Sequence, residues 1–165
     1  MTGAPGAPGA PERRRGRALG VDLGAKRIGL ALSDPSRILA TPHDTIVRAG
    51  DAGAERRAIV AAAQEAEATV IVVGLPRALS GKLGEAARAA LAEVEQLREL
   101  TRDLGIEVDT YDERFTTMIA HQGLQQAHPR KQRREKAKRE QVDAAAATVL
   151  LQSWLDAHDA RGAGG

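Results

Sequence analysis

The first part of the chain alternates between apolar positions and small or polar ones. The apolar positions are Leu19, Val21 and Leu23. In an extended segment they share one face, and Asp22 lies on the other face among small residues. A short turn over 24–27 leads into a second alternating segment over 28–32, and so short a connection joins only antiparallel strands. The pattern therefore predicts a β-hairpin, and residues 38–48 are a candidate for a third strand.

Two segments further along carry apolar residues at helical spacing, and each precedes a segment with the pattern of a strand. Residues 52–67 predict a helix before the β-branched run 69–73, which is typical of a strand covered on both faces. Residues 84–104 predict a helix that ends at Gly105, before a strand over 106–111. A strand, a helix of this length and a further strand form a parallel unit. We therefore expect an α/β fold, with a mixed central sheet opened by an antiparallel hairpin and helices on both faces.

The last third of the chain predicts two more helices. Thr116 or Thr117 can cap a short helix that runs to about Gln126, and a last, Ala-rich helix covers about residues 141–158. In the last helix the apolar positions recur at intervals of three and four, and Asp143 lies on the same stripe. A carboxylate on a stripe that packs against a sheet needs a partner.

Length and composition limit the organisation of the chain and exclude some chemistry. The 165 residues suit one domain, which we place at 17–158, with residues 1–16 and 159–165 as disordered tails. The absence of cysteine excludes disulfides, a thiolate nucleophile and Cys-ligated metal centres. Neither a membrane-spanning apolar run nor a secretory signal is found, so we expect a cytoplasmic protein.

Positive charge is concentrated in one segment, although the net charge is only +2. Between Arg130 and Glu140, seven cationic residues stand against two acidic ones. Such a segment suits a polyanion, because neutralised phosphates release condensed counterions, but a solvated linker or helix face has the same composition. Aromatic residues make up only 2% of the chain, so contacts with nucleic acid would be ionic or polar rather than stacking.

Three acidic residues on different elements are expected to converge. Asp22 lies between glycines on the first strand, which we expect to be central, and Glu113 ends a strand at the carboxyl edge, where ligands of α/β sheets gather. With Asp143 they would form a cluster that a hard cation holds together. Mg²⁺ or Mn²⁺ fits a site made of oxygen ligands, and two such ions could activate a water and stabilise the leaving oxygen of a phosphodiester.

Each of these acids also has a purely structural interpretation. Asp22 could pair with Lys26 or Arg27 at the end of its strand. Asp143 could complement the dipole at the start of its helix, and Glu113 could belong to a surface ion pair. Serine and histidine show no arrangement typical of a nucleophilic triad.

Four segments of the chain together resemble the YqgF family, also called RuvX, over residues 17–157. They are 20–29 (GVDLGAKRIG), 73–76 (VGLP), 112–117 (DERFTT) and 143–155 (DAAAATVLLQSWL). The loop 77–81 departs from the family's usual pattern, which puts substrate contacts there in question. The resemblance implies an RNase H-like fold, and it implies that Asp22, Glu113 and Asp143 are divalent-metal ligands and catalytic acids.

The resemblance further implies a nuclease that processes the 5′ end of precursor 16S ribosomal RNA, whereas the label of Holliday junction resolvase rests on kinship of fold. We therefore expect Mg²⁺ or Mn²⁺ as the cofactor, RNA rather than DNA as the partner, contact with a pre-ribosomal particle, and a monomer or weak homodimer. The residues expected to contact phosphates are Lys26, Arg27, Arg77, Arg114, Arg130, Lys131, Arg133 and Arg134.

Three other functions compete with this interpretation. An assembly factor that binds nucleic acid without cutting it would tolerate loss of an acid, yet all three are present. An ATP-binding protein is suggested by Asp22, Gly24 and Gly29, but it would need a second lobe that 165 residues do not supply. A resolvase of four-way DNA junctions would need two active sites and hence a stable dimer.

Overall fold

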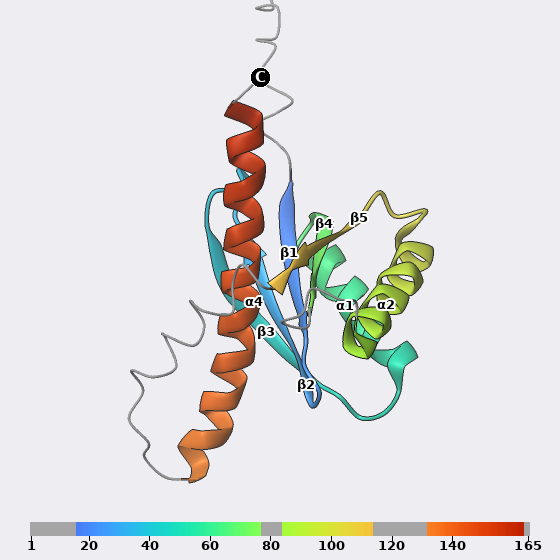
Figure 1. The fold of residues 1–165 in the computed structure, drawn as a ribbon, viewed down its shortest axis with the longest axis vertical. Helices are drawn as coiled ribbons and strands as arrows, with labels where there is room; N and C mark the ends of the chain where they lie inside the picture. Colours follow the sequence, from blue (N-terminus) through green and yellow to red (C-terminus); the bar gives the residue numbers. More distant parts are fainter. Residues whose placement is uncertain (1–15, 77–83, 114–131, 164–165) are drawn as a thin grey trace, which may run out of the picture.

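A computed structural model describes residues 16–76, 84–113 and 132–163, without the side chains of 132–143 and 160–163. Five strands form one mixed sheet in the order β3-β2-β1-β4-β5, with helices on both of its faces (Figure 1). In chain order the elements are β1 Arg17–Leu23, β2 Arg27–Ser33, β3 Ala40–Val47, α1 Ala52–Glu65, β4 Ala68–Leu75, α2 Glu85–Thr101, β5 Glu107–Asp112 and α4 Gln132–Ala163.

The strand pairing follows the expected pattern. Strand β1 pairs antiparallel with β2, which pairs antiparallel with β3, so the hairpin and the third strand are confirmed. On its other side β1 pairs parallel with β4, and β4 pairs parallel with β5. Strand β1 is therefore the middle strand, and three parallel strands bring their carboxyl ends to the same edge of the sheet.

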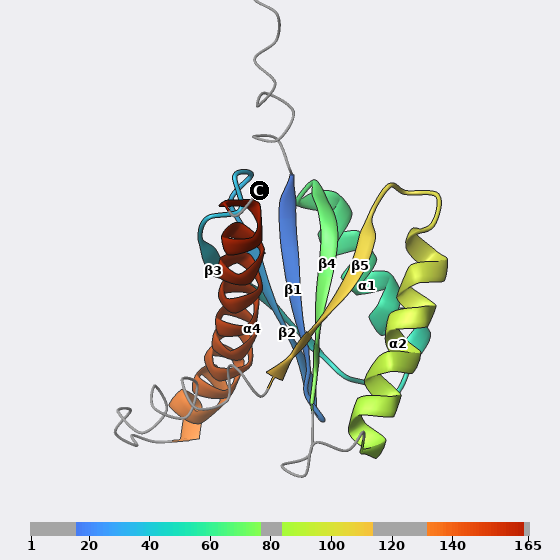
Figure 2. The ribbon, with the colours of Figure 1, turned by 45° about the horizontal axis from the view of Figure 1, so that its top comes forward.

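Two apolar layers enclose the sheet. On one face, α1 and α2 cover a core to which Leu19 and Val21 of β1 contribute. On the other face, α4 packs against a second cluster that includes Ala18 and Val72 (Figure 2). Because β1 alternates between these layers, its even-numbered residues face α4.

Helix α4 contacts β1 at very short range. An added Cβ on Gly20 would lie 2.8 Å from Leu151 Cβ and 3.1 Å from the carbonyl oxygen of Ala147. Ala147 and Leu151 are fully buried, as the apolar stripe of the last helix predicts. The glycine therefore allows the helix backbone to rest directly on the middle strand.

Helix α4 begins earlier than the sequence pattern predicts, at Gln132 rather than near residue 141, and it continues to Ala163. Residues 132–140 contain neither glycine nor proline and consist of strong helix formers. Glu135 and Arg139 also have the i,i+4 spacing that supports a helix. The part of the basic segment from 132 onward is therefore helical, and the first turns of α4 extend beyond the end of β1 (Figure 1).

Two further findings concern the extent of the described structure. The short helix expected after Thr116 lies outside the described residues. Within the described part of the chain, no helix combines the length and apolar character that crossing a membrane requires.

Candidate active site

The first predicted acid, Asp22, lies on the middle strand and faces α4. It is directly opposite Gly29 on β2. On the other side, the pairing of Val21 with Val73 places Gly74 of β4 beside Asp22. The positions directly beside Asp22 on both neighbouring strands are therefore glycines, which leave space for another group next to the Asp22 carboxyl group.

The second acid, Glu113, occupies that open space. It follows the last residue of β5, whose carboxyl end reaches toward β1 and α4 (Figures 1 and 2). Its side chain folds over Gly74, because a Cβ at that glycine would lie 2.6 Å from Glu113 Oε1 and 3.0 Å from Leu150 Cδ2. Across this gap Glu113 forms a hydrogen bond with Asp22. The structure thus brings two of the three predicted acids together from strands that are not neighbours.

The environment of this pair favours a shared proton. Burial raises the pKa of Glu113 to about 8, and the hydrogen bond with Asp22 and the negative charges of Asp22 and Asp112 act in the same direction. Near neutral pH and without a cation, Glu113 is therefore mostly protonated and donates a hydrogen bond to the Asp22 carboxylate.

The third acid, Asp143, lies on α4, and only its backbone is described. It is one turn before Ala147, which contacts Gly20 of β1. Helix α4 runs antiparallel to β1 (Figure 1), so the step from Ala147 back to Asp143 follows the direction from Gly20 to Asp22. The dipole interpretation of Asp143 is wrong, because α4 begins well before it, at Gln132.

The donor set fits a hard divalent cation. Asp22 and Glu113 offer only carboxylate oxygens, which Mg²⁺ and Mn²⁺ prefer, and a cation between them would take the place of the shared proton. Among the side chains that the structure describes, no group of three or more acidic or histidine residues is placed to hold a metal ion. A third protein ligand would come from a side chain outside that set, and the backbone of Asp143 lies on α4, one turn before Ala147.

The predicted phosphate contacts are only partly described. Lys26 is exposed in the turn after β1, and Arg27 is partly buried at the start of β2. Arg133 and Arg134 lie in the first turn of α4, but nothing is described of their side chains. The remaining predicted contacts fall outside the described residues: Arg77, Arg114, Arg130 and Lys131.

Sequence reasoning missed Arg48, which fixes the turn that follows Asp22. The Arg48 guanidinium donates to the carbonyl oxygen of Gly24 at 2.8 Å and to Glu55 Oε2 at 3.2 Å. Its backbone N–H donates to the carbonyl oxygen of Lys26 at 3.0 Å. Glu55 is 8% exposed and lies in the first turn of α1, so this arginine ties the turn to the helix layer behind the sheet. These partners are distant in sequence, and no local pattern signals them.

A cavity of about 500 Å³ lies away from the acids, around the first residues of β5. There Trp154 Nε1 donates to Asp109 Oδ2 at 2.8 Å, and the Trp154 ring stacks on His158. Neither Asp22 nor Glu113 lines this cavity. The candidate active site is therefore separate from it.

Comparisons with known proteins identify relatives of this chain. Residues 16–157 match the family model RuvX, described as Holliday junction resolvase. The chain is 42% identical over 156 residues to a Nocardia farcinica protein, covering 92% of this chain and 83% of the relative. It is 43% identical over 154 residues to a Mycobacterium tuberculosis protein, and the match covers 92% of this chain and 86% of the relative. Both relatives carry the name "Putative pre-16S rRNA nuclease".

Solved structures support the fold. The chain is similar to Thermus thermophilus RuvC in complex with a Holliday junction substrate, with a TM-score of 0.50 and 14% identity over 86% of this chain and 94% of that one. A second structure of the same RuvC gives a TM-score of 0.50 and 13% identity, over 87% and 96% of the two chains. At this identity the likeness concerns the fold, which is the RNase H-like arrangement that the family resemblance implies.

Proposed function

The chain belongs to the RuvX (YqgF) family of nucleases, which hydrolyse phosphodiester bonds and generally use divalent metal ions, and we propose that its substrate is precursor 16S ribosomal RNA. The names of relatives at 42% and 43% identity, which cover most of both chains, support this choice of substrate. The proposed reaction is cleavage near the 5′ end of the precursor. Such a role implies a cytoplasmic protein that meets pre-ribosomal particles.

One observation carries the catalytic part of the proposal: Glu113 reaches across Gly74 and shares a hydrogen bond with Asp22. We infer that Asp22, Glu113 and Asp143 hold Mg²⁺ or Mn²⁺. When bound, the ion supplies an activated water and stabilises charge on the leaving oxygen. Glu113 must give up its proton before it can act as a ligand, and Asp22, on the rigid middle strand, fixes the position of the site. The glycines beside Asp22 leave room for the substrate backbone.

Cationic residues around the acids would hold the RNA. Lys26 is exposed beside Asp22, and the basic first turns of α4 extend beyond the end of β1. Arg133 and Arg134 in those turns, together with Arg77, Arg114, Arg130 and Lys131, are the remaining proposed phosphate contacts. Contacts of this kind position a nucleic acid without reading its sequence.

Resolution of four-way DNA junctions is the second candidate function. The description of the family model and the likeness of the fold to RuvC favour it. Symmetric cleavage of a junction needs two active sites in one assembly, and hence a stable dimer. We propose a monomer or weak homodimer, which suits the cleavage of RNA better.

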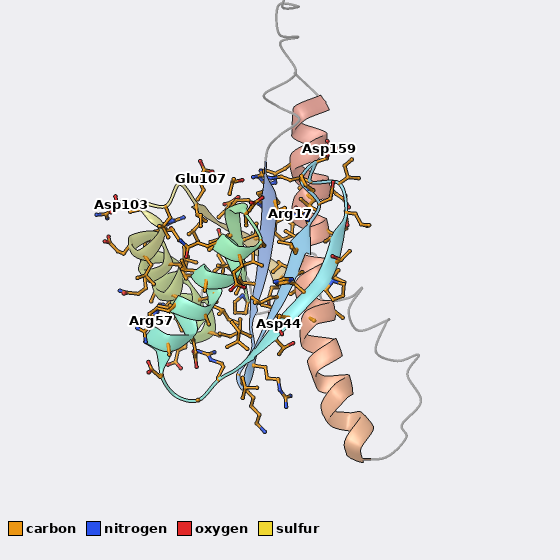
Figure 3. The ribbon with its side chains drawn as sticks, turned by 180° about the vertical axis from the view of Figure 1, so that it is seen from behind. Arg17, Asp44, Arg57, Asp103, Glu107 and Asp159 are labelled. Carbon is orange, nitrogen blue, oxygen red and sulfur yellow. The ribbon has the colours of Figure 1, made fainter. Side chains whose placement is uncertain are left out.

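A cleavage assay separates these functions. The full chain and Asp22→Asn are incubated with a precursor 16S leader RNA and with a four-way DNA junction, each in Mg²⁺, Mn²⁺ and EDTA. Asp103→Asn serves as a matched control, because Asp103 is exposed beyond the end of α2 and distant from α4 (Figure 3). We expect the RNA to be cut in either metal and not in EDTA, by the wild type and the control but not by Asp22→Asn.

Two other results of this cleavage assay would contradict the proposal. Preferential cutting of the junction would replace the RNA substrate with the DNA substrate. If the wild type and Asp22→Asn bind nucleic acid equally and neither cuts it in any metal, the catalytic proposal fails.

A further inference from the structure

Arg27 carries a buried donor that nothing in the described structure uses. Its Nε is shielded from solvent and has no hydrogen-bond partner among the described residues. The ion pairs of the described residues do not include Arg27 either. Buried polar groups in proteins are normally satisfied, and a charged donor left unpaired is costly. An orphaned guanidinium nitrogen is therefore a reason to look for a ligand.

The pattern of strand β2 places Arg27 on the same face of the sheet as Asp22. Ile28 and Leu30 belong to the core under α1 and α2, whereas Ala31 belongs to the cluster under α4. Since side chains alternate along a strand, Arg27 lies on the α4 face. Asp22 faces α4 as well and is opposite Gly29, so Arg27 is its diagonal neighbour on that face. A long side chain spans the distance between diagonal neighbours.

The backbone that carries Arg27 is held rigidly. Arg48 donates one hydrogen bond to the carbonyl oxygen of Gly24 and another to that of Lys26, while its guanidinium is anchored on the buried Glu55. The turn is also tight, because a Cβ on Gly24 would lie 2.5 Å from the carbonyl oxygen of Arg27. Arg27 is therefore presented by a preorganised element, which lowers the entropic cost of binding a ligand.

The chemistry of the Arg27 guanidinium indicates that its ligand is an anion with several oxygens. A guanidinium is a planar fork of donors that matches a phosphate bidentately, and it stays charged at any physiological pH. Arg27 is a diagonal neighbour of Asp22, yet no ion pair joins the two among the described contacts. We propose that Arg27 binds a backbone phosphate of the nucleic acid next to the bond that is cut. This inference rests on the proposed function and adds to it a substrate contact that does not pass through the metal.

Equilibrium binding tests the contact without requiring turnover. The leader RNA is titrated with the full chain in EDTA, so that it is not cut, over a series of salt concentrations. The variants are Arg27→Gln, Arg27→Lys and, as a matched control, Arg57→Gln. Arg57 is an exposed arginine on α1, on the opposite side of the sheet from α4 (Figure 3).

We expect Arg27→Gln to weaken binding about tenfold at low salt, which is the usual effect of losing one charge-assisted hydrogen bond. The slope of log K against log salt should become shallower by about 0.7, the change expected when one contact with a single-stranded phosphate is lost. Arg27→Lys should keep the slope and recover part of the affinity, because it keeps the charge but not the fork. Arg57→Gln should have the same affinity and the same salt slope as the wild type.

Thermal unfolding of the same proteins distinguishes binding from a structural role. If Arg27 serves the ligand, removing its unpaired buried donor leaves the melting temperature unchanged or raises it. A structural arginine would lower it. The inference is overturned if Arg27→Gln binds RNA with the affinity and the salt slope of the wild type, or if the wild type does not bind RNA.

The two proposals fail in distinguishable ways. If the wild type cuts RNA but Arg27→Gln shows an unchanged salt slope, the proposed function stands and only the phosphate contact is wrong. If the slope changes as expected but the wild type cuts nothing in Mg²⁺ or Mn²⁺, the phosphate contact stands and the nuclease proposal is wrong.

Discussion

At the scale of single residues, the site depends on the two glycines beside Asp22 as much as on the acids themselves. Gly29 and Gly74 flank Asp22 on the neighbouring strands, and Glu113 uses the space above Gly74 to reach it. The cost of this approach is electrostatic, since two partly buried carboxyl groups cannot both ionise easily without a cation. This repulsion and the burial of the group together raise the pKa of Glu113.

The raised pKa of Glu113, about 8 against an ordinary 4.5, predicts how metal-free stability changes with pH. Between these values the folded state holds a proton that the unfolded chain has lost. This stabilisation is fully present below about pH 4.5 and is lost as the pH rises toward 8. In EDTA, the unfolding free energy of the wild type should therefore fall relative to that of Glu113→Gln by about 1–3 kcal/mol between pH 5 and 8.

Urea unfolding at several pH values measures this difference. Glutamine keeps the shape of a protonated glutamate, and the other titrating groups are common to both proteins, so the comparison isolates Glu113. A difference between the two proteins that stays constant across this range would show that Glu113 titrates normally.

At the scale of elements, the contact of α4 with β1 decides whether Asp143 can join the pair. The helix rests on Gly20, and both its backbone and Leu151 are in the way of any side chain there. Gly20→Ala should therefore push the helix outward and destabilise the protein by about 1–3 kcal/mol, as overpacking usually does. It should also lower metal-dependent cleavage, because the backbone of Asp143 moves away from Asp22 with the helix.

Gly53→Ala is the matched control for that substitution. Gly53 lies inside α1, and an added Cβ there meets only the ends of the Arg57 and Asp51 side chains, at 3.3 and 3.4 Å. Gly53 is the second residue of α1. Alanine is favoured over glycine by about 1 kcal/mol in a helix interior and by less in the first turn, so this variant should be at least as stable as the wild type. Chemical unfolding of both variants measures these effects, and a Gly20→Ala protein as stable as the wild type would contradict the expected clash.

The elements also show where sequence reasoning succeeds and where it stops. The hairpin around Asp22 and the strand before Glu113 are encoded in local alternation, so their places in the sheet could be predicted. The start of α4 could not, because the charged composition of 132–140 also suits a solvated linker, whereas helix propensity without a breaker continues the helix. The roles of Gly74 and Arg48 depend on atoms brought close by the fold, and no local pattern contains that information.

At the scale of the whole molecule, the RNase H-like sheet gathers chemistry from distant parts of the chain. The parallel strands β1 and β5 end at the same edge, and α4 runs antiparallel to β1 on one face of the sheet (Figures 1 and 2). One acid thus comes from the first strand, one from the end of the last strand and one from the last helix. The central claim is that these three residues act as one site.

The measurement that tests this claim most directly is cleavage of the leader RNA in Mn²⁺ by Asp143→Asn, beside the wild type and Asp159→Asn. Asp159 is an exposed residue of the same helix, near its other end (Figure 3), and is the matched control. We predict that Asp143→Asn folds normally and loses at least about a hundredfold in rate, while Asp159→Asn cuts like the wild type. An Asp143→Asn protein that cuts at the wild-type rate would show that Asp143 does not belong to the site.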